Sequence, residues 1–95
     1  MTLEILTPEH KIFDGAVKAV QMPGQNGLFQ VLEGHAAMIS RLAQGAVKIE
    51  LANPASSENW HSSLTPEKGQ DDVLWLNIEG GVAEVNGNKV ILLAS

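Results

Sequence analysis

The sequence predicts an all-β fold, an antiparallel β-sandwich of about nine or ten short strands. Short apolar runs recur between turn residues, several of these runs alternate with a period of two, and no segment has a convincing helical period. The 95 residues are expected to form one domain, 1–95, with no C-terminal helical domain. Since aromatic residues make up only 4% of the chain, its core must be aliphatic.

The N-terminal part predicts two strands with a short strand or turn between them. Residues 2–7 alternate between apolar and polar side chains, which is typical of a half-buried strand. A short strand or turn at 11–13, a hairpin turn at Asp14-Gly15 and a strand at 16–22 follow. The apolar residues of this last strand are not evenly spaced. A β-bulge would bring them to one face: Val17, Val20 and Met22.

The stretch 22–45 is the centre of the pattern. Its glycines separate two apolar runs, 28–32 and 36–42, which we interpret as a strand, a turn and a second strand. A helix over 32–42 is disfavoured by Gly34. The four glycines are Gly24, Gly27, Gly34 and Gly45.

Residues 46–51 form the most regular predicted strand, with apolar side chains on one face and charged ones on the other. The polar segment 53–72 has no strand or helix period, and we interpret it as a long mobile loop within a hairpin. Trp60 is expected to anchor this loop by local packing.

The C-terminal part predicts strands at 73–78, 82–85 and 89–93. Asn86-Gly87 is expected to form a two-residue type I′ hairpin turn between the last two. The final strand is apolar on both faces. One face can cover the core, so the other requires cover from elsewhere.

Charge and composition exclude several classes of protein. The net charge is −5 and the pI is about 5.0, which disfavours binding to nucleic acid or direct attachment to an anionic membrane. No apolar run is long enough to span a bilayer, so we expect no direct membrane insertion. The N-terminus has no basic apolar leader, and the absence of cysteine excludes disulfides.

No residue pattern predicts catalysis, a metal site or a cofactor. The three histidines lack the spacing of metal ligands, and His35 is expected to brace a turn or to lie at an interface. The acidic residues are scattered over turns and solvent faces. The serines of the polar loop lack a nucleophile elbow.

The central stretch resembles the N-terminal domain of the epsilon subunit of the rotary F-type ATP synthase. That family reads Gly-x-x-Gly-x-x-Gly-Val-x-Pro-Gly-His-Ala-Pro-Leu at this point. Here Gln30, Glu33 and Ala37 replace a glycine and two prolines. The matching residues are Gly24, Gly27, Val31, Gly34, His35 and Ala36.

Two further blocks extend this resemblance over most of the chain. The N-terminal block, from Leu3 to Pro8, followed by Phe13, Gly15 and Val17, resembles the family's apolar strand, Thr-Pro-Glu and Phe-x-Gly-x-Val. The C-terminal block is similar to Gly-Gly-x-x-Glu-Val-x-x-Asn-x-Val. It comprises Gly80, Gly81, Glu84, Val85, Asn88 and Val90.

The resemblance implies a flattened β-sandwich at the foot of the central stalk, packed on the gamma subunit and resting on the polar loops of the c-ring. It implies a short form of the subunit, since the helical hairpin of the longer members would follow Ser95. The implied c-ring contact comprises Gly24, Gln25, Asn26, Gly27 and Leu28. The implied gamma contact comprises Thr7, His35, Ala36 and Ser40.

By this resemblance the chain is a non-catalytic subunit of a hetero-oligomeric complex, peripheral to the cytoplasmic face of the bacterial inner membrane. It would couple proton-driven rotation to ATP synthesis. The alternative hypothesis is a stand-alone β-sandwich that binds a small ligand or carbohydrate through Trp60, Trp75 and the long loop. A third, a hydrolytic enzyme, has no residue pattern in its favour.

Overall fold

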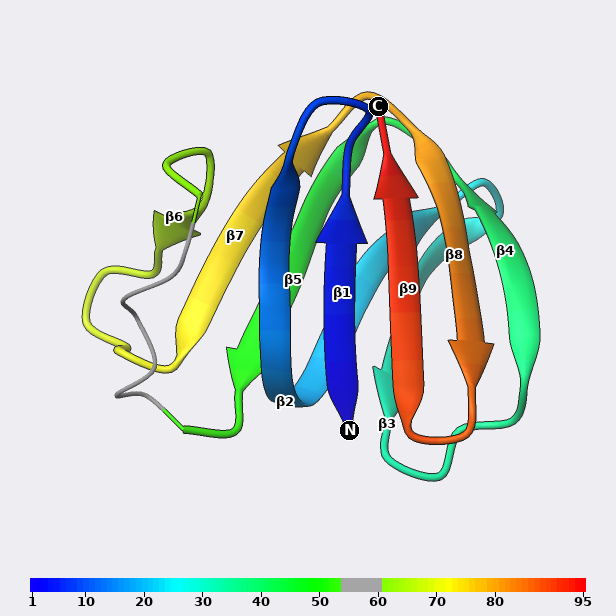
Figure 1. The fold of residues 1–95 in the computed structure, drawn as a ribbon, viewed down its shortest axis with the longest axis horizontal. Helices are drawn as coiled ribbons and strands as arrows, with labels where there is room; N and C mark the ends of the chain where they lie inside the picture. Colours follow the sequence, from blue (N-terminus) through cyan, green and yellow to red (C-terminus); the bar gives the residue numbers. More distant parts are fainter. Residues whose placement is uncertain (54–60) are drawn as a thin grey trace.

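The computed structural model describes residues 1–53 and 61–95. Within this part the chain forms nine strands and no helix, as predicted (Figure 1). Trp60 and the loop serines before it lie outside the described residues. The strands are β1 Thr2–Leu6, β2 Lys11–Gly24, β3 Gly27–Leu32, β4 Met38–Leu42, β5 Gly45–Leu51, β6 Thr65–Pro66, β7 Val73–Ile78, β8 Gly81–Asn86 and β9 Lys89–Ala94.

The strands form two packed layers joined through β2 (Figure 1). The hydrogen-bonded order is β1-β9-β8-β4-β2-β5-β7-β6, with β3 also on β2, and β1 pairs β2 as well as β9. Among the described pairings only β1 with β9 is parallel. The core between the layers is aliphatic, as expected, and its largest fully buried side chains include Leu3, Ile5, Met22, Ile49, Leu51, Leu74 and Leu92.

The strand β2 continues through the predicted Asp14-Gly15 turn, so that prediction was wrong. Asp14 pairs with Glu4 and Gly15 with Leu3, both on β1. A hairpin would need the residues on either side of Asp14-Gly15 to pair with each other, whereas here β1 supplies the partner for both sides. Gly15 instead gives room to the Phe13 ring, which would lie 3.3 Å from an added Cβ.

The predicted β-bulge in this strand is confirmed. The register against β5 shifts between Val17 and Ala19, leaving Lys18 as the extra residue. Val17, Val20 and Met22 are consequently all buried. Lys18 points to solvent, where its Nζ lies 3.2 Å from a carboxylate oxygen of Asp72.

The turn between β8 and β9 lies one residue later than predicted. Asn86 pairs with Lys89, so the two loop residues are Gly87 and Asn88. Gly87 has a φ of +62°, and no non-glycine residue of the described part has a positive φ. A type I′ turn needs positive φ at both central residues, so this turn is not type I′. Glycine alone at the first central position is typical of type II′.

The polar segment 53–72 contains structure that the sequence did not predict. Its short strand β6 pairs with Trp75 and Leu74 of β7. Leu64, just before β6, is only 6% exposed and belongs to the core. The described part of this segment is therefore attached to the sandwich by an apolar contact.

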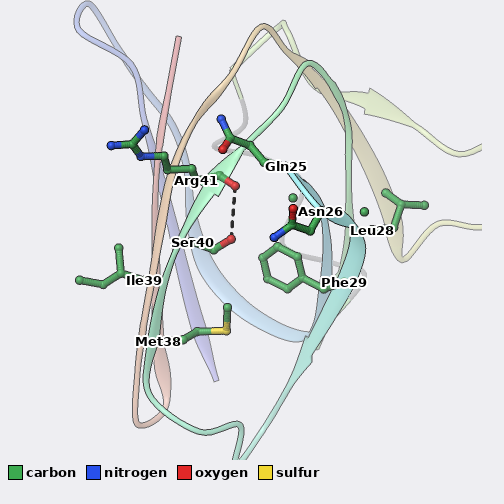
Figure 2. Close-up of a pocket in the computed structure, with 10 residues that line it drawn as sticks. Gln25, Asn26, Leu28, Phe29, Met38, Ile39, Ser40 and Arg41 are labelled. Atoms are coloured by element: carbon green, nitrogen blue, oxygen red, sulfur yellow. Dashed lines mark hydrogen bonds between the residues drawn. The ribbon is translucent and has the colours of Figure 1, made fainter.

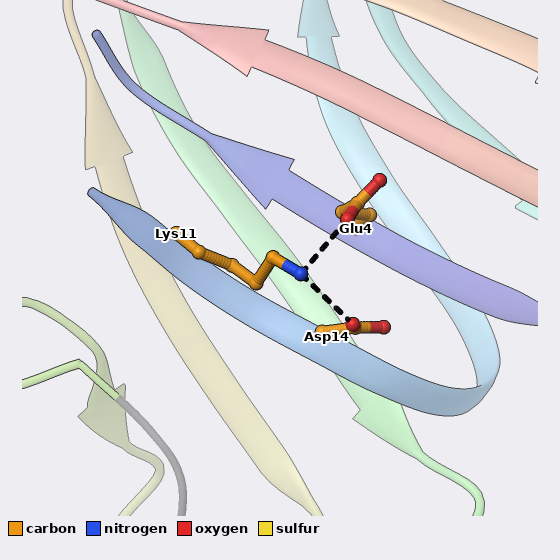
Figure 3. Close-up of polar contacts among 3 residues, drawn as sticks. All are labelled: Glu4, Lys11 and Asp14. Atoms are coloured by element: carbon orange, nitrogen blue, oxygen red, sulfur yellow. Dashed lines mark hydrogen bonds and ion pairs between the residues drawn. The ribbon is translucent and has the colours of Figure 1, made fainter. Parts of the chain in front are cut away.

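A charged cluster crosses the outer surface of β1 and β2 (Figure 3). Lys11 Nζ lies 3.2 Å from Glu4 Oε2 and 3.3 Å from Asp14 Oδ2. The pKa of Lys11 is raised above its ordinary value. The largest cause is the hydrogen bond to Glu4, and the next is the hydrogen bond to Asp14. Because Lys11 is exposed, solvent screens this cluster and its contribution to stability is small.

Within the described residues, no helix is long and apolar enough to cross a lipid bilayer.

Replacing Gly81 with alanine is expected to destabilise the fold. Gly81 has a φ of +153°, and an added Cβ would collide with the Leu93 carbonyl oxygen across the β8–β9 ladder. We expect a loss of about 2 to 3 kcal/mol in the free energy of unfolding, measured by urea denaturation. The matched control is Gly80→Ala, whose Cβ would lie 3.5 Å from the Leu42 carbonyl oxygen, an ordinary contact. Equal stability of the two variants would contradict this interpretation.

Candidate interaction surface

The β2–β3 hairpin forms a protruding tip whose glycines are required by its geometry. Gln25 and Asn26 are the two turn residues between the paired Gly24 and Gly27. Gly27 has a φ of +122°, and an added Cβ on Gly24 would lie 2.8 Å from the Gly27 carbonyl oxygen. The close approach of the two backbones therefore excludes a side chain at Gly24, and the positive φ favours glycine at Gly27.

Backbone hydrogen bonds hold this tip against the end of β4. The Gln25 N–H donates to the Arg41 carbonyl oxygen at 3.2 Å, and the Ala43 N–H donates to the Pro23 carbonyl oxygen at 2.8 Å. Pro23 has no N–H to donate. It pairs with Leu28 at a position of the β2–β3 ladder where the two residues do not hydrogen-bond to each other. The tip is therefore a fixed feature of the sandwich.

A slot of about 460 Å³ separates β3 from β4 beside the tip (Figure 2). Phe29 and Met38 are half-buried and form its floor. Leu28 and Ile39 stand at its rim with 66% and 72% of their surfaces exposed. Among the described residues that line it, Arg41 is the only charged one.

All five residues predicted to contact the c-ring lie together in this region. The tip itself carries no charge, and Leu28 gives it one large exposed apolar side chain. All five line the slot: Gly24, Gln25, Asn26, Gly27 and Leu28.

The four residues predicted to contact gamma are more widely distributed. Ser40 lies on β4 in the slot, where its hydroxyl donates to the Arg41 carbonyl oxygen at 3.3 Å. His35 and Ala36 belong to the β3–β4 connection, and Thr7 belongs to the β1–β2 connection at the opposite end of the sandwich in Figure 1. The structure therefore places only Ser40 beside the tip.

His35 and Thr7 both brace their own loops. The His35 N–H donates to the Leu32 carbonyl oxygen at 3.1 Å, and His35 Nδ1 lies 2.7 Å from the Ala36 carbonyl oxygen. The Thr7 N–H donates to the His10 carbonyl oxygen at 2.9 Å, and the His10 N–H donates to Thr7 Oγ1 at 3.1 Å. The expected role of His35 in bracing its turn is confirmed.

The outward face of the β4-β8-β9 layer carries exposed apolar side chains. Ile39, Val82 and Leu93 are 72%, 39% and 52% exposed, and with the half-buried Ile91 they line one shallow hollow. We call these four residues the outer apolar patch. It confirms that β9 has a second apolar face. Ile39 and Val82 did not indicate this patch in the sequence, because each is a single apolar residue on a strand whose neighbours are not evident from the sequence.

The outer apolar patch lies between two of the residues predicted to contact gamma, Thr7 and Ser40. Thr7 lines a hollow together with Leu93, at one end of the patch. Ile39, at the other end, precedes Ser40 on β4. Two parts of the predicted gamma contact are thus joined by a largely apolar face, in which the exposed Glu84 lies between Ile39 and Ile91.

No group of three or more metal-ligating side chains occurs among the described residues. The His10 and His61 rings lie with centroids 4.7 Å apart and their planes tilted by 41°, and His61 Nδ1 lies 2.9 Å from Ser63 Oγ. The Ser63 hydroxyl thus lies beside an imidazole, in a local contact in which the Ser63 N–H also donates to His61 Nδ1 at 3.1 Å. Trp75, which the ligand-binding hypothesis used, is half-buried with Lys48 Nζ 5.7 Å from its ring centroid. These contacts do not single out ligand binding or hydrolysis.

A small β-sandwich with an uncharged rigid tip and an exposed apolar face is an interaction module. Residues 1–95 match the family described as ATP synthase, Delta/Epsilon chain, beta-sandwich domain. The chain is 39% identical over 92 residues to the ATP synthase epsilon chain of Chlorobaculum tepidum, covering 97% of this chain and 85% of that one. It is 47% identical over 94 residues to the epsilon chain of Campylobacter jejuni strain 81-176, covering 99% of this chain but 60% of that one. The chain therefore belongs to the ATP synthase delta/epsilon family.

Two solved structures share the fold. One is the central stalk and c-ring of the Tetrahymena thermophila mitochondrial ATP synthase, with a TM-score of 0.67 at 16% identity, covering 99% of this chain and 62% of the matched chain. The other is the OSCP/F1/c-ring part of the Euglena gracilis enzyme, with a TM-score of 0.69 at 23% identity, covering 97% of this chain and 48% of the matched chain.

Replacing Gly24 with alanine is expected to distort the tip. The added Cβ would lie 2.8 Å from the Gly27 carbonyl oxygen and 3.0 Å from the Phe29 ring. We expect a loss of about 1 to 2 kcal/mol in unfolding free energy and a changed amide chemical shift at Gln25. The control Asn26→Ala changes an exposed turn residue without positive φ, and it should leave both measurements nearly unchanged. A stable Gly24→Ala variant with an undisturbed Gln25 amide would contradict the proposed crowding.

Proposed function

We propose that this chain is a non-catalytic central-stalk subunit of a proton-translocating F-type ATP synthase. In this role it binds the gamma subunit and the c-ring and couples rotation to ATP synthesis. The observation that carries the proposal is the family match over residues 1–95. The rigid tip and the outer apolar patch supply the two surfaces that such a role requires.

The tip is the proposed contact with the c-ring. Its backbone groups and the side chains of Gln25 and Asn26 offer hydrogen bonds, and Leu28 offers apolar area. Since the tip carries no charge, this contact depends on shape, hydrogen bonding and apolar burial. The proposed contact residues are Gly24, Gln25, Asn26, Gly27 and Leu28.

The β4-β8-β9 layer is the proposed contact with gamma. The outer apolar patch favours this assignment, because it joins the hollow beside Thr7 to the strand that carries Ser40. His35 and Ala36 extend the surface into the β3–β4 connection. Docking of this face on a stalk subunit would remove exposed apolar area from water.

We further propose that the chain lies at the cytoplasmic face of the bacterial inner membrane as a peripheral protein. Its attachment there would be through the c-ring, since the net charge of −5 opposes adsorption to anionic lipid.

Purification of the tagged chain from the membranes of its own cells tests the function. Mass spectrometry should recover the alpha, beta, gamma and c subunits with it. Reproducible recovery of none of them would overturn the proposal.

Replacing Leu28 with serine should weaken binding to the c-ring. Leu28 is 66% exposed in the chain alone, and covering most of it is worth about 1 to 2 kcal/mol. We therefore expect affinity for purified c-ring to fall about five- to twenty-fold, measured by biolayer interferometry in detergent. Leu32→Ser is the matched control, since Leu32 is 53% exposed on the same face of β3 but lies away from the tip. Equal losses in both variants would contradict a contact centred on the tip.

A further inference from the structure

Glu84 lies in the middle of the outer apolar patch. On one side it pairs with Ile39 of β4, and on the other side it pairs with Ile91 of β9. Its neighbours on β8, Ala83 and Val85, are buried, and successive side chains of a strand point to opposite faces. The exposed Glu84 side chain therefore points outward between two apolar side chains.

The carboxylate of Glu84 has no ion-pair partner within the described residues. Two basic residues on the same face are its diagonal neighbours, since Arg41 pairs with Val82 and Lys89 pairs with Asn86. Both are exposed, and neither forms an ion pair with Glu84. In the free chain, water therefore solvates this carboxylate.

A partner that covers the outer apolar patch also covers Glu84. Neighbouring strands are about 4.8 Å apart, so contact with both Ile39 and Ile91 spans about 10 Å with Glu84 in the middle. Val82 and Leu93 line the same hollow, whose volume is about 270 Å³. Burial of this apolar area consequently removes one carboxylate from water.

A carboxylate that leaves water without a partner opposes binding strongly, whereas a close, hydrogen-bonded cation offsets that cost. We propose that the gamma subunit places a lysine or arginine side chain opposite Glu84, surrounded by the apolar contacts of the outer apolar patch. This ion pair would fix the register of gamma on a face that is otherwise largely apolar. The inference rests on the proposed function and deepens it.

The other source of positive charge is the chain itself. Diagonal neighbours in a sheet are about 7 to 8 Å apart, within reach of the long side chains of Arg41 and Lys89. Pairing from either would take a second charge of this chain out of water, although neither pairs with Glu84 in the free chain. The net charge of −5 also favours a partner surface that carries positive charge. These observations favour gamma as the source.

Glu84→Gln tests the proposal through the sign of its effect. The substitution keeps the size of the side chain but removes its charge. If a gamma cation faces Glu84, the variant leaves that cation unpaired, and affinity for purified gamma subunit should fall at least about tenfold by isothermal titration calorimetry. If no cation faces Glu84, the variant removes the cost of burying a charge. Equal or higher affinity would therefore overturn the proposal.

Glu50→Gln is the matched control. Glu50 lies on β5, which pairs with β2 and β7 in the other layer, so the variant makes the same change in net charge away from the patch. It should bind gamma as the unchanged chain does. Equal losses in the two variants would indicate a general effect of net charge and would also overturn the proposal. Urea unfolding of the free variants verifies that both are folded.

The source of the cation is tested in a chain that carries Arg41→Gln and Lys89→Gln. Adding Glu84→Gln to this chain should still lower the affinity about tenfold, because the cation belongs to gamma. Loss of the Glu84→Gln effect in this background would assign the cation to this chain and would overturn the proposal.

Proton uptake is a further measurement, and it uses the unchanged chain. Calorimetry in two buffers of different ionisation enthalpy should show no proton uptake at Glu84 when gamma binds at pH 7, because the carboxylate stays ionised beside a cation. Uptake of a proton that disappears in Glu84→Gln would show that protonation neutralises Glu84, and no cation would be needed.

Failure of this inference differs from failure of the proposed function. If the unchanged chain does not bind gamma at all, the proposed function itself fails. If the unchanged chain binds gamma and Glu84→Gln binds as well or better, the gamma contact stands and only the ion pair is overturned.

Discussion

The structure depends on β2 continuing without a break from Lys11 to Gly24. Its first half pairs with β1, and its second half pairs with β5 on one edge and β3 on the other. The bulge at Lys18 keeps apolar side chains turned inward as the strand passes from one layer to the next. Without that extra residue, Val17 and Val20 would point to opposite faces, and one of them would leave the core.

The interaction surfaces follow from where β2 ends. At Gly24 the chain turns back into β3, while β4 approaches the other edge of β2 only at its last residue. β3 and β4 consequently share a neighbour at one end but do not pair with each other. The slot between them is a product of this topology, and the glycine-rich turn that fixes it is also the tip.

Sequence reasoning succeeded where the signal was local and periodic. The alternation in 46–51 and 73–78 predicted the inward residues of β5 and β7, since a period of two requires no knowledge of the partner strand. The bulge was also predictable from local spacing, because the apolar residues Val17, Val20 and Met22 depart from a period of two. Asp14-Gly15 and Asn86-Gly87 were misassigned because a turn dipeptide reports local preference, whereas the register is set by distant partners. Leu64 was overlooked because a single apolar residue in a polar segment has no period.

The interaction surfaces also differ in how far the sequence predicted them. The tip was evident in the sequence, because clustered glycines report backbone geometry directly. The outer apolar patch combines residues of three strands, and only the doubly apolar β9 indicated it. The slot could not be predicted at all, since it depends on two strands failing to pair.

Charge is sparse at the tip and at the slot, while the hollow of the outer apolar patch includes one charged side chain, that of Glu84. Eleven acidic residues and six basic ones give a net charge of −5, yet the tip has none of them and the slot has only Arg41. The charged pairs formed by Lys11 and Lys18 lie elsewhere, on exposed parts of β2. Repulsion among the remaining acidic groups keeps such a molecule soluble while apolar area stays exposed. At the tip, apolar burial and backbone hydrogen bonds can then hold a partner with little desolvation of charge, which would otherwise offset the gain on binding.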